Sequence, residues 1–139
     1  MQKIIDIFIG LPGSGKTHIL NGWDANFVVV DNVYENYPAN FNLTKSLMAE
    51  GINLAVSDVI FCRREKLEEF EKFIPADYHK RYFYFENNPM ECKLNVVRRN
   101  SKNYIEQLKL IDKLTENYHP AKYSGCLITV YKYENKNPN

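Results

Sequence analysis

The stretch GLPGSGKT, residues 10–17, decides the fold of this chain. It matches the pattern GxxxxGK[ST], in which a glycine-rich loop ends in a lysine and a hydroxyl residue. A β-branched apolar run over residues 4–9 precedes it, and apolar residues at helical spacing follow over residues 17–23. Strand, glycine loop and helix, in that order, form the context in which this pattern binds phosphate. We therefore predict a phosphate-binding loop rather than a glycine-rich turn that fits the pattern by chance.

The residue types of this loop each suit a phosphate ligand. Glycines let the backbone approach phosphate closely, so that successive N–H groups point inward at the start of a helix. Lys16 would bring a positive charge to the β and γ oxygens, and the Thr17 hydroxyl would bind Mg²⁺. For His18, one residue further on, a solvated or packing role is the alternative. The candidate residues for binding ATP, or another nucleoside triphosphate, are Gly10, Pro12, Gly13, Ser14, Gly15, Lys16, Thr17 and His18.

The remaining chain alternates between strand-like and helix-like segments. Further strands are expected over residues 27–30, 52–56, 82–85 and 127–131, and helices over 44–50, 63–74, 88–97 and 105–114, with 32–42 irregular. This alternation predicts an α/β, three-layer P-loop fold: a five-stranded parallel sheet of order 2-3-1-4-5 with helices on both faces. The polar stretch 98–103 predicts a turn or mobile cap inside a small helical lid near 88–117. We expect one domain over residues 1–133 and a frayed tail over 134–139.

Composition narrows the class of protein. The chain has 139 residues, 18 basic against 17 acidic, so its net charge of +1 does not favour nucleic acid or a membrane surface as a partner. An anionic ligand therefore needs a local site. Three separated cysteines without CxxC spacing argue against a disulfide scaffold or a zinc site, and no apolar run is long enough to cross a membrane. We expect a cytoplasmic protein, and the abundance of Asn, Lys, Ile and Tyr would fit an AT-rich phage, virus or bacterial genome.

Two aspartates stand where predicted strands end. Asp31 follows the second strand and Asp58 the third, and the carboxyl ends of parallel strands share one edge of the sheet, beside the loop. Phosphoryl transfer needs one carboxylate to hold the metal ion and another to orient or deprotonate the accepting hydroxyl. We assign the metal role to Asp58 and the base role to Asp31. The alternatives are a helix cap for Asp58 and a turn aspartate for Asp31.

Three segments together resemble a known family. They are GLPGSGKT at residues 10–17, SDVIFCRREKLEEFEKF from Ser57, and ENNPMECKLNVVRRNSK at residues 86–102. They resemble the small P-loop kinases that are similar to the kinase domain of phage polynucleotide kinase. The resemblance spans most of the chain, although only the first segment is specific by itself. It implies a lid helix whose arginine reaches over the triphosphate, with Arg99 the first candidate and Arg98 the second; a solvated basic helix end is the alternative.

The resemblance implies a function as well as a fold. It implies phosphoryl transfer, dependent on ATP and Mg²⁺, to a nucleic acid 5′-hydroxyl or to a nucleoside or nucleotide. In this family an arginine commonly follows the acceptor-side aspartate within a turn, whereas Asn-Val-Tyr-Glu follows Asp31 here, which leaves the acceptor open. Tyr34 and Tyr37 could stack on an acceptor base, with core packing as the alternative. The rival functions are an ATP-hydrolysing module that acts on a partner and a catalytically silent nucleotide binder, and the oligomeric state is not predicted.

Overall fold

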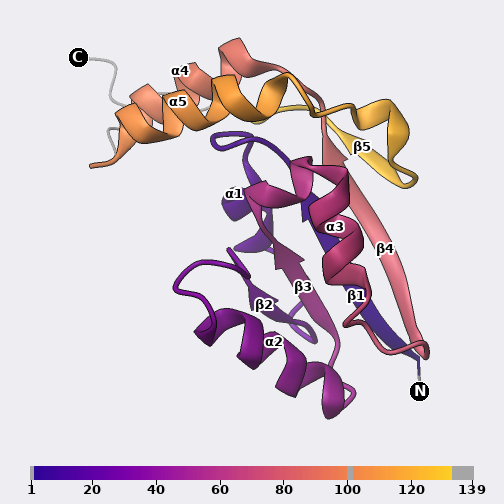
Figure 1. The fold of residues 1–139 in the computed structure, drawn as a ribbon. Helices are drawn as coiled ribbons and strands as arrows, with labels where there is room; N and C mark the ends of the chain where they lie inside the picture. The colour runs from indigo at the N-terminus through magenta and orange to yellow at the C-terminus, as the bar shows by residue number, and fades with distance from the viewer. Residues whose placement is uncertain (1, 100–101, 133–139) are drawn as a thin grey trace.

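The computed structural model describes residues 2–99 and 102–132, and a parallel sheet forms its centre (Figure 1). Its strands stand in the order β2-β3-β1-β4-β5, and all neighbouring pairs are parallel. This confirms the predicted order, with β1 and its following loop at the centre of the sheet. The strands are β1 (Lys3–Ile9), β2 (Val28–Val30), β3 (Leu54–Ser57), β4 (Tyr78–Phe85) and β5 (Cys126–Ile128).

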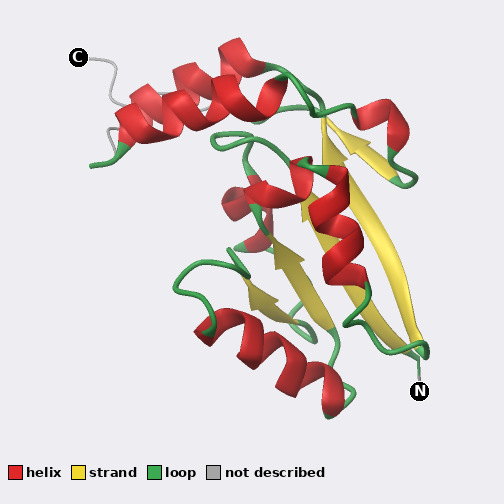
Figure 2. Cartoon of the chain, in the orientation of Figure 1, coloured by secondary structure: helices red, strands yellow, loops and turns green. Residues whose placement is uncertain are grey.

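Helices cover both faces of the sheet and its carboxyl edge (Figure 2). They are α1 (Lys16–Leu20), α2 (Ala39–Ala49), α3 (Arg64–Glu71), α4 (Pro89–Arg99) and α5 (Tyr104–Thr115), with short 3-10 turns η1 (Val59–Cys62) and η2 (Pro120–Lys122). In Figure 1, α3 lies on the near face, α1 lies behind the sheet, and α4 and α5 run side by side above the strand ends. Among the described residues, no helix combines the length and the apolar character needed to cross a membrane.

The core has two parts because side chains of β1 alternate between the faces of the sheet. Ile5, Ile7 and Ile9 join the larger cluster, which includes apolar side chains of α2 to α5. Phe8 points to the other face and packs with Leu20 of α1. All four β1 side chains are fully buried, so the strand is held firmly up to the residue where the phosphate loop begins.

Several element boundaries differ from the predictions. The helix expected over 44–50 begins at Ala39, so the prediction that residues 39–42 are irregular is wrong. Phe41 is the buried residue of that stretch and anchors it to the core. β4 begins at Tyr78 rather than residue 82, because its polar residues 79–81 are paired with β1. Helix α4 continues to Arg99, through the start of the expected turn. The rest of that turn at residues 100–101 and the tail expected to fray lie outside the described residues.

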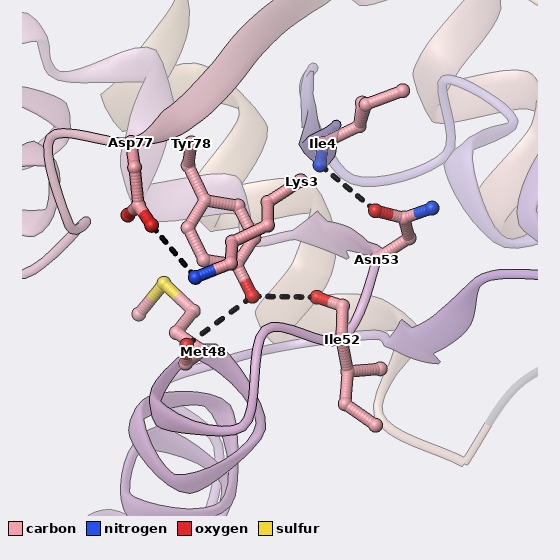
Figure 3. A network of polar contacts seen from close by, with 7 residues as sticks. All are labelled: Lys3, Ile4, Met48, Ile52, Asn53, Asp77 and Tyr78. Atoms are coloured by element: carbon pink, nitrogen blue, oxygen red, sulfur yellow. Dashed lines mark hydrogen bonds and ion pairs between the residues drawn. The ribbon is translucent and has the colours of Figure 1, made fainter. Parts of the chain in front are cut away.

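Polar contacts at the amino end of the sheet join three neighbouring elements (Figure 3). The Tyr78 hydroxyl donates a hydrogen bond to the carbonyl oxygen of Ile52, 2.7 Å away, and lies 3.3 Å from that of Met48 at the end of α2. The Asn53 side-chain oxygen accepts from the Ile4 N–H at 2.8 Å. These bonds fix the start of β1 and β4 against the α2–β3 connection.

Replacing Tyr78 by phenylalanine should lower the free energy of unfolding by about 1–2 kcal/mol, because the carbonyl oxygen of Ile52 loses the hydroxyl that donates to it. Lys3→Met is the matched control. It breaks the 2.6 Å ion pair with Asp77, whose side chain is 58% exposed, and should lower the free energy of unfolding less than Tyr78→Phe does. Denaturant titration followed by the fluorescence of the single tryptophan measures both, and equal losses would contradict the prediction.

Candidate active site

A cavity of about 700 Å³ is formed by the phosphate loop, the residues that follow β2 and β3, and side chains of α4 and α5. Most of the residues predicted from sequence line it together: Pro12, Gly13, Gly15, Lys16, Thr17, His18, Asp31, Asp58 and Arg99. Gly10, Ser14 and Arg98 belong to the predicted set but are not among the residues that line the cavity. The tertiary fold thus gathers residues that lie up to 87 positions apart in sequence, from Pro12 to Arg99.

Two glycines of the loop have conformations and surroundings that exclude a side chain. Gly13 has φ of 81° and Gly15 has φ of 108°, both in the left-handed region. A Cβ on Gly13 would lie 2.4 Å from the carbonyl oxygen of Cys92 in α4, and one on Gly15 would lie 2.6 Å from Cβ of Tyr131. The glycines therefore allow α4 and the segment after β5 to pack directly on the loop.

Lys16 is folded into the loop. Its ammonium donates hydrogen bonds to the carbonyl oxygens of Gly10 at 2.7 Å and Leu11 at 2.9 Å, and lies 3.3 Å from the Ser14 hydroxyl. The side chain is buried, and this burial lowers the pKa of the ammonium. These three oxygens hold the ammonium at the base of the loop.

Asp31 bridges the phosphate loop and the neighbouring strand. Its Oδ2 accepts a hydrogen bond from the Thr17 hydroxyl at 2.7 Å, and its Oδ1 accepts from the hydroxyl of Ser57, the last residue of β3. Ser57, a fully buried residue, was not identified from sequence as part of the site. The arrangement places a carboxylate directly beside the hydroxyl that is predicted to bind the metal ion.

Asp58 has different surroundings. Its side chain is nearly buried, Oδ1 accepts from the N–H of Ile60 at 3.0 Å, and Oδ2 accepts from the N–H of Tyr34 at 2.9 Å. Burial raises the pKa of this carboxyl, and the two backbone bonds partly oppose that shift. Asp58 is therefore the cap of η1, the alternative considered from sequence, and it also fixes the segment that follows Asp31.

The two arginines at the end of α4 have different surroundings. Arg99 lines the cavity and donates to the Gln107 side-chain oxygen at 2.9 Å, and Gln107 in turn donates to Asn103 at 2.7 Å. Arg98 instead lies 3.7 Å from the Glu91 carboxylate. Of the two arginines, Arg99 is therefore the one that lines the cavity.

His18 and Asn95 both contact the segment that follows β5. The His18 ring stacks on Tyr131 with centroids 4.1 Å apart. Asn95 was not identified from sequence; its side-chain amide donates to the carbonyl oxygen of Gly13 at 2.9 Å and to that of Tyr131. Asn95 lies on the buried side of α4, together with Cys92 and Val96. A polar residue on that side needs a hydrogen-bond partner, and this is the signal that could have revealed its role. Asn95 therefore joins α4, the loop and the segment that follows β5.

Replacing Asn95 by alanine should lower the free energy of unfolding by about 1–3 kcal/mol, because the carbonyl groups of Gly13 and Tyr131 lose a donor. The bond from Asn95 to Gly13 also holds the phosphate loop. Its loss should therefore raise the Kd of an ATP analogue about fivefold to tenfold, roughly 1 kcal/mol. Thermal melting and calorimetric titration measure the two effects. Asn117→Ala, at an exposed position, is the matched control and should change neither the stability nor the Kd. An unchanged Kd of the ATP analogue in Asn95→Ala would contradict the prediction that Asn95 supports the loop.

Comparison with known proteins places this geometry in context. No family model matches the sequence. An uncharacterized protein of Acanthamoeba polyphaga mimivirus is 33% identical over 140 residues, which cover 96% of each chain. The chain belongs to the same family as that viral protein.

Solved structures of kinases share the fold at low sequence identity. A gluconokinase from Sinorhizobium meliloti matches with a TM-score of 0.62 and 11% identity, over 94% of this chain and 85% of its own. A fungal RNA kinase matches with a TM-score of 0.57 and 14% identity, over 99% and 79%. A shikimate kinase from Bacteroides thetaiotaomicron matches with a TM-score of 0.51 and 13% identity, over 91% and 86%. The chain therefore has a P-loop kinase fold, which confirms the resemblance found in the sequence.

Proposed function

We propose that this protein is a P-loop kinase that transfers the γ-phosphoryl group of ATP to an acceptor hydroxyl, on a nucleic acid 5′ end or on a nucleoside or nucleotide. One observation carries the proposal: a single cavity brings together Lys16, Thr17, Asp31 and Arg99. These supply a phosphate-binding cation, a metal-binding hydroxyl, a carboxylate and a second cation, which are the groups that phosphoryl transfer requires.

The loop suits a triphosphate and its metal ion. The N–H groups at the start of α1 and the Lys16 ammonium would bind the β and γ oxygens, once Lys16 exchanges its carbonyl partners for phosphate. Hydroxyl and carboxylate oxygens are the ligands that Mg²⁺ prefers, so Thr17 and a neighbouring carboxylate fit that ion. Bound Mg²⁺ would neutralise charge on the phosphate oxygens.

The two aspartates, Asp31 and Asp58, would have different roles in the reaction. Asp31 would orient the acceptor hydroxyl and take its proton, and its bond to Thr17 places it next to the metal site as well. Asp58 would contribute to metal binding through a water molecule, because both of its oxygens already accept backbone hydrogen bonds. It also fixes Tyr34 in the cavity wall.

Helices α4 and α5 would act as the lid. Arg99, supplied by the chain itself, would stabilise the charge that spreads over the transferring phosphoryl group. Its hydrogen bond to Gln107 connects it to α5. An arginine in cis favours a kinase over the rival function, a module that hydrolyses ATP to act on a partner.

Incubation with γ-labelled ATP, Mg²⁺ and a panel of acceptors tests the proposal. The panel contains nucleosides, mononucleotides and 5′-hydroxyl oligonucleotides. Label should appear in an acceptor, and no transfer should occur without Mg²⁺. Label recovered only as free phosphate would instead support the ATP-hydrolysing module, and a protein that binds the nucleotide but releases no label would support the catalytically silent binder.

A further inference from the structure

A second cavity, of about 450 Å³, is separate from the candidate active site. Its lining comes from two segments, the start of α3 and the connection between α5 and β5. In Figure 1 these are the upper end of α3 and the yellow-orange segment that leads into β5. Among the described residues, none lines both cavities. The second cavity therefore needs an explanation of its own.

Contacts between the two segments hold the walls of the second cavity together. The side chain of Tyr123 is buried, and its hydroxyl donates to the carbonyl oxygen of Phe61 at 2.8 Å. The Arg64 guanidinium donates to the backbone carbonyl oxygen of Lys122 and lies over the Tyr123 ring, 5.5 Å from its centroid. Nε of Arg64 also lies 3.4 Å from the Glu68 carboxylate. Arg64 is thus a structural part of the wall.

Two other cations of the second cavity are not held in this way. Arg63 is half-buried and Lys122 is exposed, and both line the cavity. Within residues 2–99 and 102–132, neither side chain takes part in a hydrogen bond or an ion pair. These two charged groups are therefore available to a ligand.

Positive charge is in excess in the second cavity. Arg63, Arg64 and Lys122 line it together with a single carboxylate, that of Glu65. The whole chain is almost balanced, with 18 basic and 17 acidic residues, so this excess is a local feature. Like charges that share a cavity repel one another, and a bound anion would replace this repulsion by attraction.

The polar groups of the second cavity suit phosphate. The planar guanidinium of arginine can contact two phosphate oxygens at once, and lysine adds a compact positive charge. The lining also includes His119 and Asn117, whose imidazole and amide can donate hydrogen bonds to oxygen. A phosphate monoester has three free oxygens and a charge of about −1.5 to −2 at neutral pH, so it can contact several of these groups together. The volume falls within the range of small-molecule sites, about 300–1,000 Å³.

We propose that the second cavity is an anion site that binds a phosphate group and is separate from the phosphate loop. Arg63 and Lys122 would contact the phosphate oxygens, and Arg64 would complete the positively charged wall. Because the site uses no residue of the loop, it does not depend on the proposed function. A phosphate group can come from two sources, a free phosphorylated small molecule or the backbone of a nucleic acid strand, and the experiment distinguishes them.

Titration with inorganic phosphate tests the proposal. The full chain is first saturated with a non-hydrolysable ATP analogue and Mg²⁺, which fills the phosphate loop. It is then titrated calorimetrically with phosphate at constant ionic strength, because salt screens charges near the surface. We expect saturable binding of one phosphate per chain. Acetate, which carries one charge and two oxygens, should bind about tenfold more weakly or less tightly still.

Three variants locate the bound phosphate. Lys122→Gln should raise the phosphate Kd about tenfold, the effect of losing one contact to a charged group, and Arg63→Gln should raise it at least as much. The fold uses the backbone carbonyl of Lys122 and not its ammonium, so the bond from Arg64 remains in Lys122→Gln. Lys72→Gln is the matched control: Lys72 is an exposed residue at the other end of α3 and does not line the cavity. It removes the same charge and should leave the Kd unchanged.

The source of the phosphate follows from two further ligands, glycerol phosphate and a single-stranded oligonucleotide. A free small molecule is the source if Lys122→Gln weakens glycerol phosphate and leaves the oligonucleotide unaffected. A strand is the source if the variant weakens the oligonucleotide and also makes its binding less dependent on salt, because fewer backbone phosphates are then neutralised.

Each remaining outcome decides the proposal. Absence of saturable phosphate binding to the wild type would overturn it, and so would equal effects of Lys122→Gln and Lys72→Gln. Thermal melting of each variant verifies folding, and if Arg63→Gln does not fold, the comparison of the two lysine variants is sufficient. Failure of the ATP analogue to bind would contradict the proposed function alone. The two lysine variants, titrated with phosphate in the absence of the analogue, would still decide whether the second cavity binds the anion.

Discussion

Replacing Lys16 by alanine should slow phosphoryl transfer by more than about a hundredfold, a loss on the order of 3 kcal/mol or more in transition-state stabilisation. The ammonium would contact the β and γ oxygens, and this contact strengthens as charge develops during transfer. Turnover under saturating ATP and Mg²⁺ measures the effect. Lys80→Ala, an exposed lysine at the opposite end of the sheet, is the matched control and should keep wild-type turnover.

The same variant should remain folded. Burial lowers the pKa of Lys16, which means that its charged form costs stability in the folded protein at pH values below that lowered pKa. Alanine removes this cost and also removes the donor to the carbonyl oxygens of Gly10 and Leu11, so the two effects offset each other. The melting temperature of Lys16→Ala should therefore be close to that of the wild type. Wild-type turnover in Lys16→Ala would contradict the assignment of the loop.

Replacing Asp31 by asparagine should slow transfer to the acceptor about 10²-fold to 10⁴-fold, the range for loss of a general base, and leave binding of an ATP analogue nearly intact. The amide keeps the size of the carboxylate and can still accept from Thr17 or from Ser57. Single-turnover rates and calorimetric titration with the analogue measure the two quantities.

Asp58→Asn is the variant to compare with Asp31→Asn. It should weaken the Mg²⁺ dependence of binding and rate, and it should also lower the free energy of unfolding by about 1–3 kcal/mol. An asparagine has one side-chain oxygen, so the N–H groups of Tyr34 and Ile60 would compete for a single acceptor. If both variants lost only Mg²⁺ affinity, Asp31 would belong to the metal site and the base would be another residue.

The sequence alone determined the phosphate loop, the parallel sheet and its strand order. The properties of residues 10–17 depend on near neighbours: positive φ at glycines, a lysine and a threonine at fixed spacing, and a strand that runs into a helix. The order of the strands follows from right-handed crossovers between alternating strands and helices. The predicted ends of helices and strands were less accurate where strand pairing or one buried side chain, rather than a periodic apolar pattern, determines the structure. Residues 79–81 of β4 and Phe41 in α2 are the two examples.

Only the tertiary structure decided the surroundings of each candidate side chain. Arg98 and Arg99 are adjacent in sequence, yet they point about 100° apart around the helix, so one pairs with Glu91 and the other lines the cavity. Asp31 and Asp58 look alike as strand-end carboxylates, but Asp31 receives two hydroxyl donors and Asp58 two backbone N–H groups. Ser57, Asn95 and Tyr34 owe their places to partners that are 24 or more residues away in sequence. Contacts of that kind depend on how separate elements pack together, and no local pattern of residues encodes them.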